Sequence, residues 1–437
     1  MNPARPPFWR IGVAVAVALI LGCAGTGAAR AQGNPPPGPT EDEVARQGAR
    51  RLDLLQAQLL LATGQFGAAR EAYQQLRGNM ADSAEPMSGL AAIARDSGRT
   101  RLSRSLLEGA LLLAPEDPAL AQALAAQDRA RAPRLRLDLD QRFQRAGGGS
   151  RADITTGEAS IQAGIGDAWR VGATQGVAYV DARRTQRANG AIGNFSGIRE
   201  RTEVFVQHEW LEGQSLTAML FGNEWSAGFG LLGRLPDDSG QTSLRAEYRR
   251  PIWEFVEAII AGATRDRVSV ERVQRFTHRL SARIDAALNR YGVPRDDDDV
   301  LRSATLRGEL RLDAIGDVRG LSIAYVLDAE YVLRRDRRSL PGGGTVHPLP
   351  IVDREVHAGL LSFGDSIGGE PGAGRLSWRG SAGYGVDRYG LSGPLAFASV
   401  GYVRGSFEAS LRAGYVRNIG RSAGETFSIG ATLAWIF

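Results

Sequence analysis

The sequence contains no lysine, and Cys23 is its one cysteine in 437 residues. The 53 basic residues are therefore all arginines, and the formal net charge of +5 comes from guanidinium groups alone. Because these arginines are interleaved with acidic residues and do not form a basic cluster, we expect no nucleic-acid partner. A single cysteine also excludes a disulfide within the chain.

Long hydrophobic runs are equally scarce. The run at residues 11–22 is shorter than the roughly 20 residues that a spanning helix needs, and no other run approaches that length. It lies between two arginines at positions 5 and 10 and the small-x-small sequence Ala29-Arg30-Ala31, which predicts a secretory signal peptide over residues 1–31. Residues 20–23 resemble a lipobox, so acylation of Cys23 is an alternative. Because no other run is long enough for a spanning helix, a mature chain inserted in a membrane must cross it with strands.

Residues with chemical reactivity are few and badly spaced for catalysis. The motif at residues 363–366 matches the nucleophile block of GDSL-type hydrolases, but no histidine follows His357 to act as a base; we interpret it as a Gly-rich turn. The aspartate run 296–299 offers calcium ligands, although a solvated loop explains it as well. Metal-ligand spacing is absent among the histidines, which are His208, His278, His347 and His357. We therefore predict no catalytic site, no cofactor and no metal site.

The N-terminal part has a helical pattern. Residues 32–43 are rich in Pro and Gly and predict a linker, and residues 44–131 place apolar side chains at helical spacing. Ala57, Gly64 and Ala69 are followed 34 residues later by Ala91, Gly98 and Ser103. This period, with small residues where helices touch, resembles the tetratricopeptide repeat; a plain helical hairpin bundle is the alternative. The residues expected in the helix contacts and turns are Ala57, Gly64, Ala69, Tyr73, Ala91, Gly98 and Pro115.

Residues 134–437 alternate with a period of two. Segments such as 280–288 and 321–331 carry apolar residues on one face and Arg, Asp, Glu, Ser or Gly on the other. Strands of this length, with aromatic residues near their ends, are typical of an outer-membrane β-barrel, which must close because lipid offers no partner to an edge strand. The predicted fold is a short α-helical domain followed by a closed antiparallel transmembrane β-barrel of about sixteen strands, with fourteen or eighteen as alternatives.

The predicted strands leave long connections on one side of the barrel, opposite the helical domain. These connections are residues 182–199, 251–265, 290–302 and 334–354, and residues 364–374 form a long turn on the other side. Within 251–266, apolar residues recur at helical spacing after Pro251, which predicts a short helix that lies in an outer loop or folds into the mouth of the pore.

The last strand has one continuous apolar face. Bacterial barrels commonly end in an aromatic residue preceded by alternate apolar ones, and this stretch is similar to the signal that the barrel-assembly machinery recognises. We expect the last strand to pair with the first, which leaves no free sheet edge. The residues of this face are Phe427, Ile429, Leu433, Trp435 and Phe437.

The opposite faces of the strands carry alternating charges that would line the lumen. Such ladders can exchange hydrogen bonds with a sugar chain as it slides; bracing of the barrel is the alternative role for each residue. The predicted polymer path consists of Arg279, Arg283, Asp285, Arg307, Glu309, Arg311, Asp313, Asp328, Glu330, Arg379, Glu408 and Arg412.

The order of parts resembles the outer-membrane exopolysaccharide exporters for Pel polysaccharide, poly-N-acetylglucosamine and cellulose. The fragments 264–268, 288–293, 327–332 and 348–357 look most like the Pel-type barrel. The resemblance implies a passive conduit for an exopolysaccharide in the lipids of a Gram-negative outer membrane, with the helical domain in the periplasm docking a polysaccharide-modifying enzyme. Those exporters carry longer repeat arrays than the two repeats seen in this chain. A translocator of surface proteins or lipoproteins and a small-solute porin are the alternatives.

Overall fold

The computed structural model describes residues 40–146, 149–294, 297–313, 320–339, 343–368, 374–419 and 424–437. The predicted signal peptide, Cys23 and most of the predicted linker lie outside these residues. Residues from Arg50 to Phe437 belong to one compact unit, which holds most of the helical region and the whole barrel.

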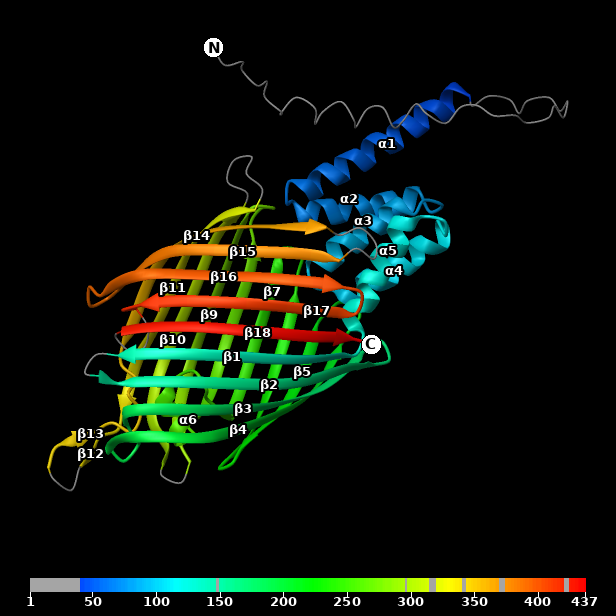
Figure 1. Cartoon of the computed structure of the whole chain (residues 1–437). Coiled ribbons are helices and arrows are strands. Elements are labelled where there is room, and N and C mark those ends of the chain that lie inside the picture. The colour runs from blue at the N-terminus through cyan, green and yellow to red at the C-terminus, as the bar shows by residue number, and fades with distance from the viewer. Residues whose placement is uncertain are drawn as a thin grey trace, which may run out of the picture. The chain divides into compact units, whose positions relative to one another are not determined.

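The helical region contains five helices, as Figure 1 shows in blue and cyan. Gly64 and Gly98 have φ angles of 81° and 83°, in the left-handed region that glycine adopts without strain. The N–H of the residue after each glycine donates to a carbonyl five residues earlier, Gln65 to Leu60 and Arg99 to Ala94. The first two helical hairpins therefore turn in the same way, 34 residues apart. The helices are α1 (Glu41–Ala62), α2 (Phe66–Asn79), α3 (Glu85–Asp96), α4 (Thr100–Leu113) and α5 (Pro118–Arg131).

Small residues let these helices approach closely. Ala57, Ala69 and Ala91 are at most 1% exposed, and Tyr73 is 3% exposed. A Cβ added at Gly89 would lie 2.4 Å from the Tyr73 ring, so the ring occupies the space that this glycine leaves. Pro115, in contrast, is exposed in the connection before α5. None of the described helices is long and apolar enough to cross a membrane.

Sixteen antiparallel strands form a closed barrel (Figure 1), which confirms the predicted architecture. The strands of its first half are β1 (Arg134–Ala146), β2 (Arg151–Ile165), β3 (Trp169–Gln186), β4 (Ile192–Glu209), β5 (Ser215–Asn223), β6 (Ala227–Pro236), β7 (Gly240–Pro251) and β8 (Thr264–Arg275). Those of its second half are β9 (Leu280–Val293), β10 (Asp297–Asp313), β11 (Leu321–Arg335), β14 (Arg354–Gly368), β15 (Arg375–Asp387), β16 (Ser392–Arg404), β17 (Phe407–Arg417) and β18 (Gly424–Ile436). A separate hairpin, β12 (Arg338–Ser339) with β13 (Thr345–Val346), lies in the connection between β11 and β14.

The barrel closes between its first and last strands, as predicted. β1 pairs with β18 in an antiparallel register that sets Leu137 opposite Leu433 and Phe143 opposite Phe427. The two phenylalanine rings stack with centroids 6.1 Å apart. Beyond β18, the N–H of Phe437 donates to the Pro133 carbonyl over 2.9 Å. The pairing of the last strand with the first therefore continues to Phe437.

Two of the predicted long connections are wrong. β3 continues to Gln186 and β4 begins at Ile192, so most of 182–199 is strand, and β9 and β10 likewise absorb most of 290–302. In both connections the strands stay hydrogen-bonded to each other although their outward residues become polar. Backbone hydrogen bonds between strands do not need an apolar face. The motif at 363–366 also lies within β14 and not in a turn.

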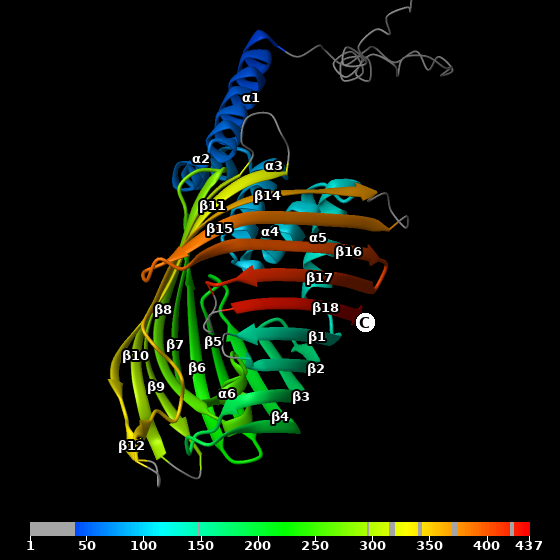
Figure 2. The same cartoon turned by 60° about the vertical axis from the view of Figure 1, so that its left-hand side comes forward.

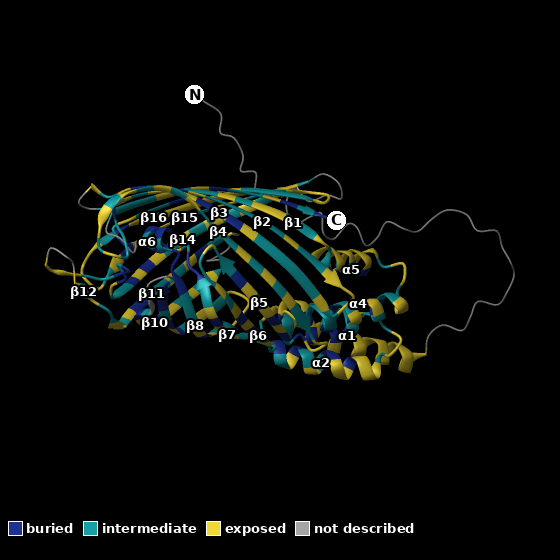
Figure 3. Cartoon of the chain, turned by 90° about the horizontal axis from the view of Figure 1, so that it is seen from below, coloured by how far each residue is buried: buried dark blue, intermediate teal, exposed yellow. Residues whose placement is uncertain are grey.

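Exposure alternates along the strands, as the stripes in Figure 3 show. Large apolar side chains of one register are exposed on the outside of the barrel, for example Leu139 (60%), Leu220 (66%), Leu288 (62%) and Leu411 (62%). The other register points into the barrel and carries most of the charges. The barrel is thus apolar outside and polar inside.

Candidate functional site in the barrel lumen

The register places most of the predicted path on the inward face. Arg307 lies opposite Asp285 on β9 and opposite Asp328 on β11, while its neighbour Leu306 pairs within the outward register. Arg279 differs, because it lies in the turn between β8 and β9. The predicted residues in the inward register are Arg283, Asp285, Arg307, Glu309, Arg311, Asp313, Asp328, Glu330, Arg379, Glu408 and Arg412.

Many of these charges are already paired across the wall. Arg311 contacts Asp313 of the same strand at 2.7 Å, and Arg412 contacts Asp140 on the first strand at 3.1 Å. Other pairs are Arg283 with Glu271 at 2.7 Å, Arg134 with Glu408 at 3.5 Å, and Arg267 with Asp285. The partners on β1 and β8 were not singled out from the sequence, because pairing across strands depends on the register.

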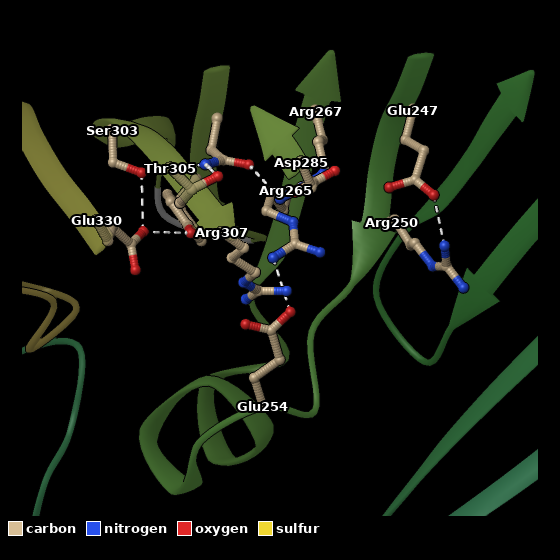
Figure 4. A network of polar contacts seen from close by, with 12 residues as sticks. Glu247, Arg250, Glu254, Arg265, Arg267, Asp285, Ser303, Thr305, Arg307 and Glu330 are labelled. Carbon is tan, nitrogen blue, oxygen red and sulfur yellow. Dashed lines mark hydrogen bonds and ion pairs between the residues drawn. The ribbon is translucent and has the colours of Figure 1, made fainter. Parts of the chain in front are cut away.

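Glu330 has a different environment from the rest. It is 2% exposed, and its Oε1 accepts hydrogen bonds from Tyr291 Oη at 2.7 Å and Ser303 Oγ at 2.8 Å. Figure 4 shows this cluster on the wall beside Thr305. Glu330 therefore belongs to a packed part of the wall, where its carboxylate holds β9, β10 and β11 together.

Among the described residues, two cavities lie along the lumen wall. Cavity A, of about 680 Å³, is lined by residues of β6 to β11, among them Arg234 and Glu309. Cavity B, of about 530 Å³, lies between Arg142 of β1, Arg354 of β14 and the connections that follow β7 and β11. Arg307 and Asp328 line both cavities. The passage from one cavity to the other therefore runs past this pair.

The junction between the cavities is an arginine–aspartate–arginine group. Arg307 Nε lies 3.5 Å from Asp328 Oδ1, and Arg354 Nη1 lies 2.7 Å from Asp328 Oδ2. One carboxylate thus holds two guanidinium groups from neighbouring strands. A solute that moves along this part of the wall from one cavity to the other passes this group.

The connection between β7 and β8 narrows the lumen. It contains α6 (Val256–Ala261), which confirms the predicted short helix. Val256, Ile259 and Ile260 pack against inward-facing Ile154 and Val180 of β2 and β3. Since β2 and β3 are not neighbours of β7 and β8 in the sheet, this segment reaches across the lumen, as Figures 1 and 2 show by placing α6 beside β3 and β4.

Polar contacts hold the α6 segment in place. Glu254 Oε1 accepts from Arg265 Nη1 at 2.7 Å (Figure 4), and Arg142 donates to the Glu254 carbonyl at 3.3 Å. The Arg201 guanidinium lies 4.3 Å from the Trp253 ring centroid, a cation–π arrangement. Glu257 borders cavity B, and burial raises the pKa of its carboxyl group above the usual range.

A second connection, between β11 and β14, folds inward near the same end. Leu349 and Ile351 pack in one cluster with Tyr291 and Leu301. Gln186 at the end of β3 donates to the His347 carbonyl over 2.7 Å. Together, these two connections leave cavity B as the space between them and the wall.

The opposite end of the barrel, which we call the helical end, contacts α2 to α5. Glu209 at the end of β4 accepts from Thr100 Oγ1 at 2.6 Å and from the Arg101 N–H at 3.2 Å. Arg99 pairs with Asp238 in the turn between β6 and β7 at 3.1 Å, and Arg275 lies over the Phe66 ring at 4.5 Å. Three connections at this end thus meet the helices.

Sequence reasoning missed Glu254, Arg265, Trp253 and Arg354. Arg265 and Arg354 do share the inward register, so continued alternation through β8 and β14 was the available signal. A β-bulge between Glu247 and Arg250 shifts the register of β7 against β8, but the alternation along β8 and β14 themselves is unbroken. Among the described residues, no group of three or more potential ligands could hold a metal ion.

No protein-family model matches the sequence, and no curated protein matches it significantly. Solved structures that resemble it include a bacterial polysaccharide outer membrane secretin, at 12% identity and a TM-score of 0.49, over 70% of this chain and 99% of that one. The monoaromatic hydrocarbon channel TodX (a deletion mutant) has 12% identity and a TM-score of 0.37, over 70% and 90%. The Pseudomonas aeruginosa protein OccK8 (OprE) has 10% identity and a TM-score of 0.35, over 70% of this chain and 98% of that one. These likenesses extend to the barrel fold alone.

Proposed function

We propose that the chain is an outer-membrane channel that exports a hydrophilic exopolysaccharide from the periplasm to the cell surface. The observation that carries the proposal is the lumen: a closed barrel of sixteen strands encloses two polar cavities that meet at Arg307 and Asp328. A barrel of this size leaves an aqueous channel when its interior is not fully packed.

The outer face supports a membrane location. Its exposed rows of leucine, valine and isoleucine exceed what a soluble monomer leaves in contact with water, and they suit the lipids of a bacterial outer membrane. On this proposal, residues 1–31 direct secretion, the helical end faces the periplasm, and the apolar row of β18 serves as the signal for the barrel-assembly machinery.

Part of the lumen wall favours a flexible polar polymer. The inward positions of β15 to β18 are rich in Ser, Thr and Gly, among them Ser381, Ser399, Gly414 and Ser428, and also include Arg379, Phe397 and Arg412. Hydroxyl groups can exchange hydrogen bonds with a sugar chain without holding any one residue tightly. The polymer moves passively, and α2 to α5 offer the surface on which a periplasmic polysaccharide-modifying enzyme docks.

A small-solute porin is the second candidate, favoured by the α6 segment, which narrows the lumen beside cavity B. In the exporter, that segment moves aside while polymer passes. Loss of the channel should leave polymer in the periplasm if the chain is an exporter, and should slow the uptake of small solutes if it is a porin.

A deletion strain tests the proposal. We expect it to lose surface polysaccharide and to retain polymer in the periplasm, and expression of the wild-type chain should restore secretion. An outward substitution such as Ala398→Ser, placed on the apolar face, is a control that should restore secretion equally. Normal polymer secretion by the deletion strain, with slower uptake of small solutes, would support the porin; a surface protein trapped in the periplasm would support the translocator.

A further inference from the structure

Two arginines at the helical end of the lumen have free guanidinium groups. Arg170 on β3 and Arg234 on β6 lie in the inward register and are half-buried. Across the described ranges of the chain, neither guanidinium makes an ion pair or a hydrogen bond. Each therefore presents five N–H donors without a protein acceptor, although most other lumen arginines have one.

The charges around this pair are mainly positive. Arg131 of α5, Arg134 of β1 and Arg234 lie close enough to Arg170 to repel its charge, and Glu209 is the carboxylate that opposes them. Glu209 is already engaged, because it accepts from Thr100 Oγ1 and the Arg101 N–H and lies 3.8 Å from Arg131 Nη1. Arg234 is repelled by Arg245 and attracted by Glu209 and Glu271, and Glu271 is already paired with Arg283. Both carboxylates near the pair are therefore shared with other groups.

Arg234 also lines cavity A, where the other arginines are paired. Six arginines and four carboxylates line this cavity. Three of those carboxylates are paired within it, Asp285 with Arg267, Glu271 with Arg283, and Asp328 with Arg307. Arg245 and Arg265 pair with Glu247 and Glu254 outside the lining. Among the described residues, Arg234 and Glu309 are thus the lining charges without an ion pair. Arg234 belongs both to the lining of cavity A and to the group at the helical end. In a narrow lumen with walls of low dielectric constant, the field of unpaired charges such as Arg170 and Arg234 is focused on the solute.

We propose that Arg170 and Arg234 form an anion-binding entrance, and that the exported polymer is an acidic polysaccharide whose uronate carboxylates bind there. This inference rests on the proposed export function and adds the charge class of the cargo. A planar guanidinium binds a carboxylate through two parallel hydrogen bonds, and half-burial reduces the screening of that contact by salt. Neutral polymers lack this contact, and cationic polymers are repelled.

Ion selectivity of the full-length channel in planar bilayers tests the entrance. Under a potassium chloride gradient, we expect the reversal potential of the wild type to show a preference for chloride. The variant R170Q/R234Q should shift the reversal potential toward potassium, and R170K/R234K, which keeps the charge, should not. The control R50Q/R51Q removes the same charge from exposed positions on α1 and should leave the reversal potential unchanged.

Block of the current by oligosaccharides tests the cargo class. Oligogalacturonate added on the helical side should block wild-type channels more strongly than dextran or chitosan oligomers. R170Q/R234Q should bind it about tenfold more weakly, as expected for the loss of charged hydrogen bonds.

Cation selectivity of the wild type, or block by dextran as strong as by oligogalacturonate, would overturn the inference while leaving a polymer channel in place. A chain that inserts and conducts no ions would contradict the proposed function instead. If R170Q/R234Q fails to insert, the reversal potentials of the wild type and of R170K/R234K still test the inference. An anion-binding entrance requires both of these proteins to prefer chloride.

Discussion

At the residue scale, the absence of lysine makes every lumen cation a guanidinium. A guanidinium presents several N–H donors in one plane, and the Asp328 carboxylate lies between two such groups, those of Arg307 and Arg354. Half-exposed pairs of this kind contribute little to stability. Their effect on the size and charge of the passage is therefore the better measure of their role.

Arg307 gives the first prediction. Arg307→Ala should raise single-channel conductance, because it removes the side chain that borders both cavities and leaves Asp328 paired with Arg354. The matched change Arg302→Ala removes an exposed arginine that pairs with Asp299 and lines neither cavity, so conductance should stay at the wild-type value. Equal conductance of all three proteins would show that the passage does not run past Arg307.

Two glycines in the helical region give the second prediction. Gly89→Ala should destabilise α2 and α3 by about 1–3 kcal/mol, since the new methyl group would collide with the Tyr73 ring. Gly67→Ala meets nothing within 4 Å and should stabilise α2 by roughly 0.5–1 kcal/mol. Hydrogen exchange of the α2 and α3 amides in the full-length protein measures both changes. Faster exchange in Gly67→Ala than in Gly89→Ala would contradict this packing.

At the element scale, alternation of apolar residues was enough to predict the sixteen strands, and helical spacing was enough to predict α6. The strand ends near 187 and 293 were missed, because the apolar face stops before the hydrogen-bonded ladder does. The inward direction of Arg307 or Asp328 follows from alternation, but their pairing follows from register, which no single strand reveals. The burial of Glu330 by Tyr291 and the packing of α6 against Val180 depend on contacts between distant segments.

The α6 segment gives the third prediction. Replacing residues 253–262 by a short Gly-Ser linker should raise single-channel conductance, because the segment that reaches across to β2 and β3 is removed. As a control, Gly-Ser replacement of the turn at 388–391, between β15 and β16, should change nothing, since that turn borders neither cavity. If the first replacement leaves conductance at the wild-type value, α6 does not restrict the pore.

At the scale of the whole molecule, the apolar outer face and the polar lumen follow from one alternation continued around a closed sheet. The helices meet connections at one end of the barrel, and the α6 segment and the inward-folded connection after β11 restrict the other. A polymer that enters at the helical end would pass Arg170 and Arg234, cavity A, the Arg307–Asp328–Arg354 group and cavity B in turn. Passage of a polysaccharide through this lumen is the central claim of the export proposal.

Site-specific photo-crosslinking in secreting cells tests that claim most directly. A photoreactive residue would be placed at Ser399, which faces the lumen, or at the neighbouring Ala398, which faces outward. The export proposal predicts carbohydrate-containing adducts at Ser399 during polymer secretion and none at Ala398. Secretion of polymer without any adduct at Ser399, or an adduct there that contains protein and no carbohydrate, would contradict it.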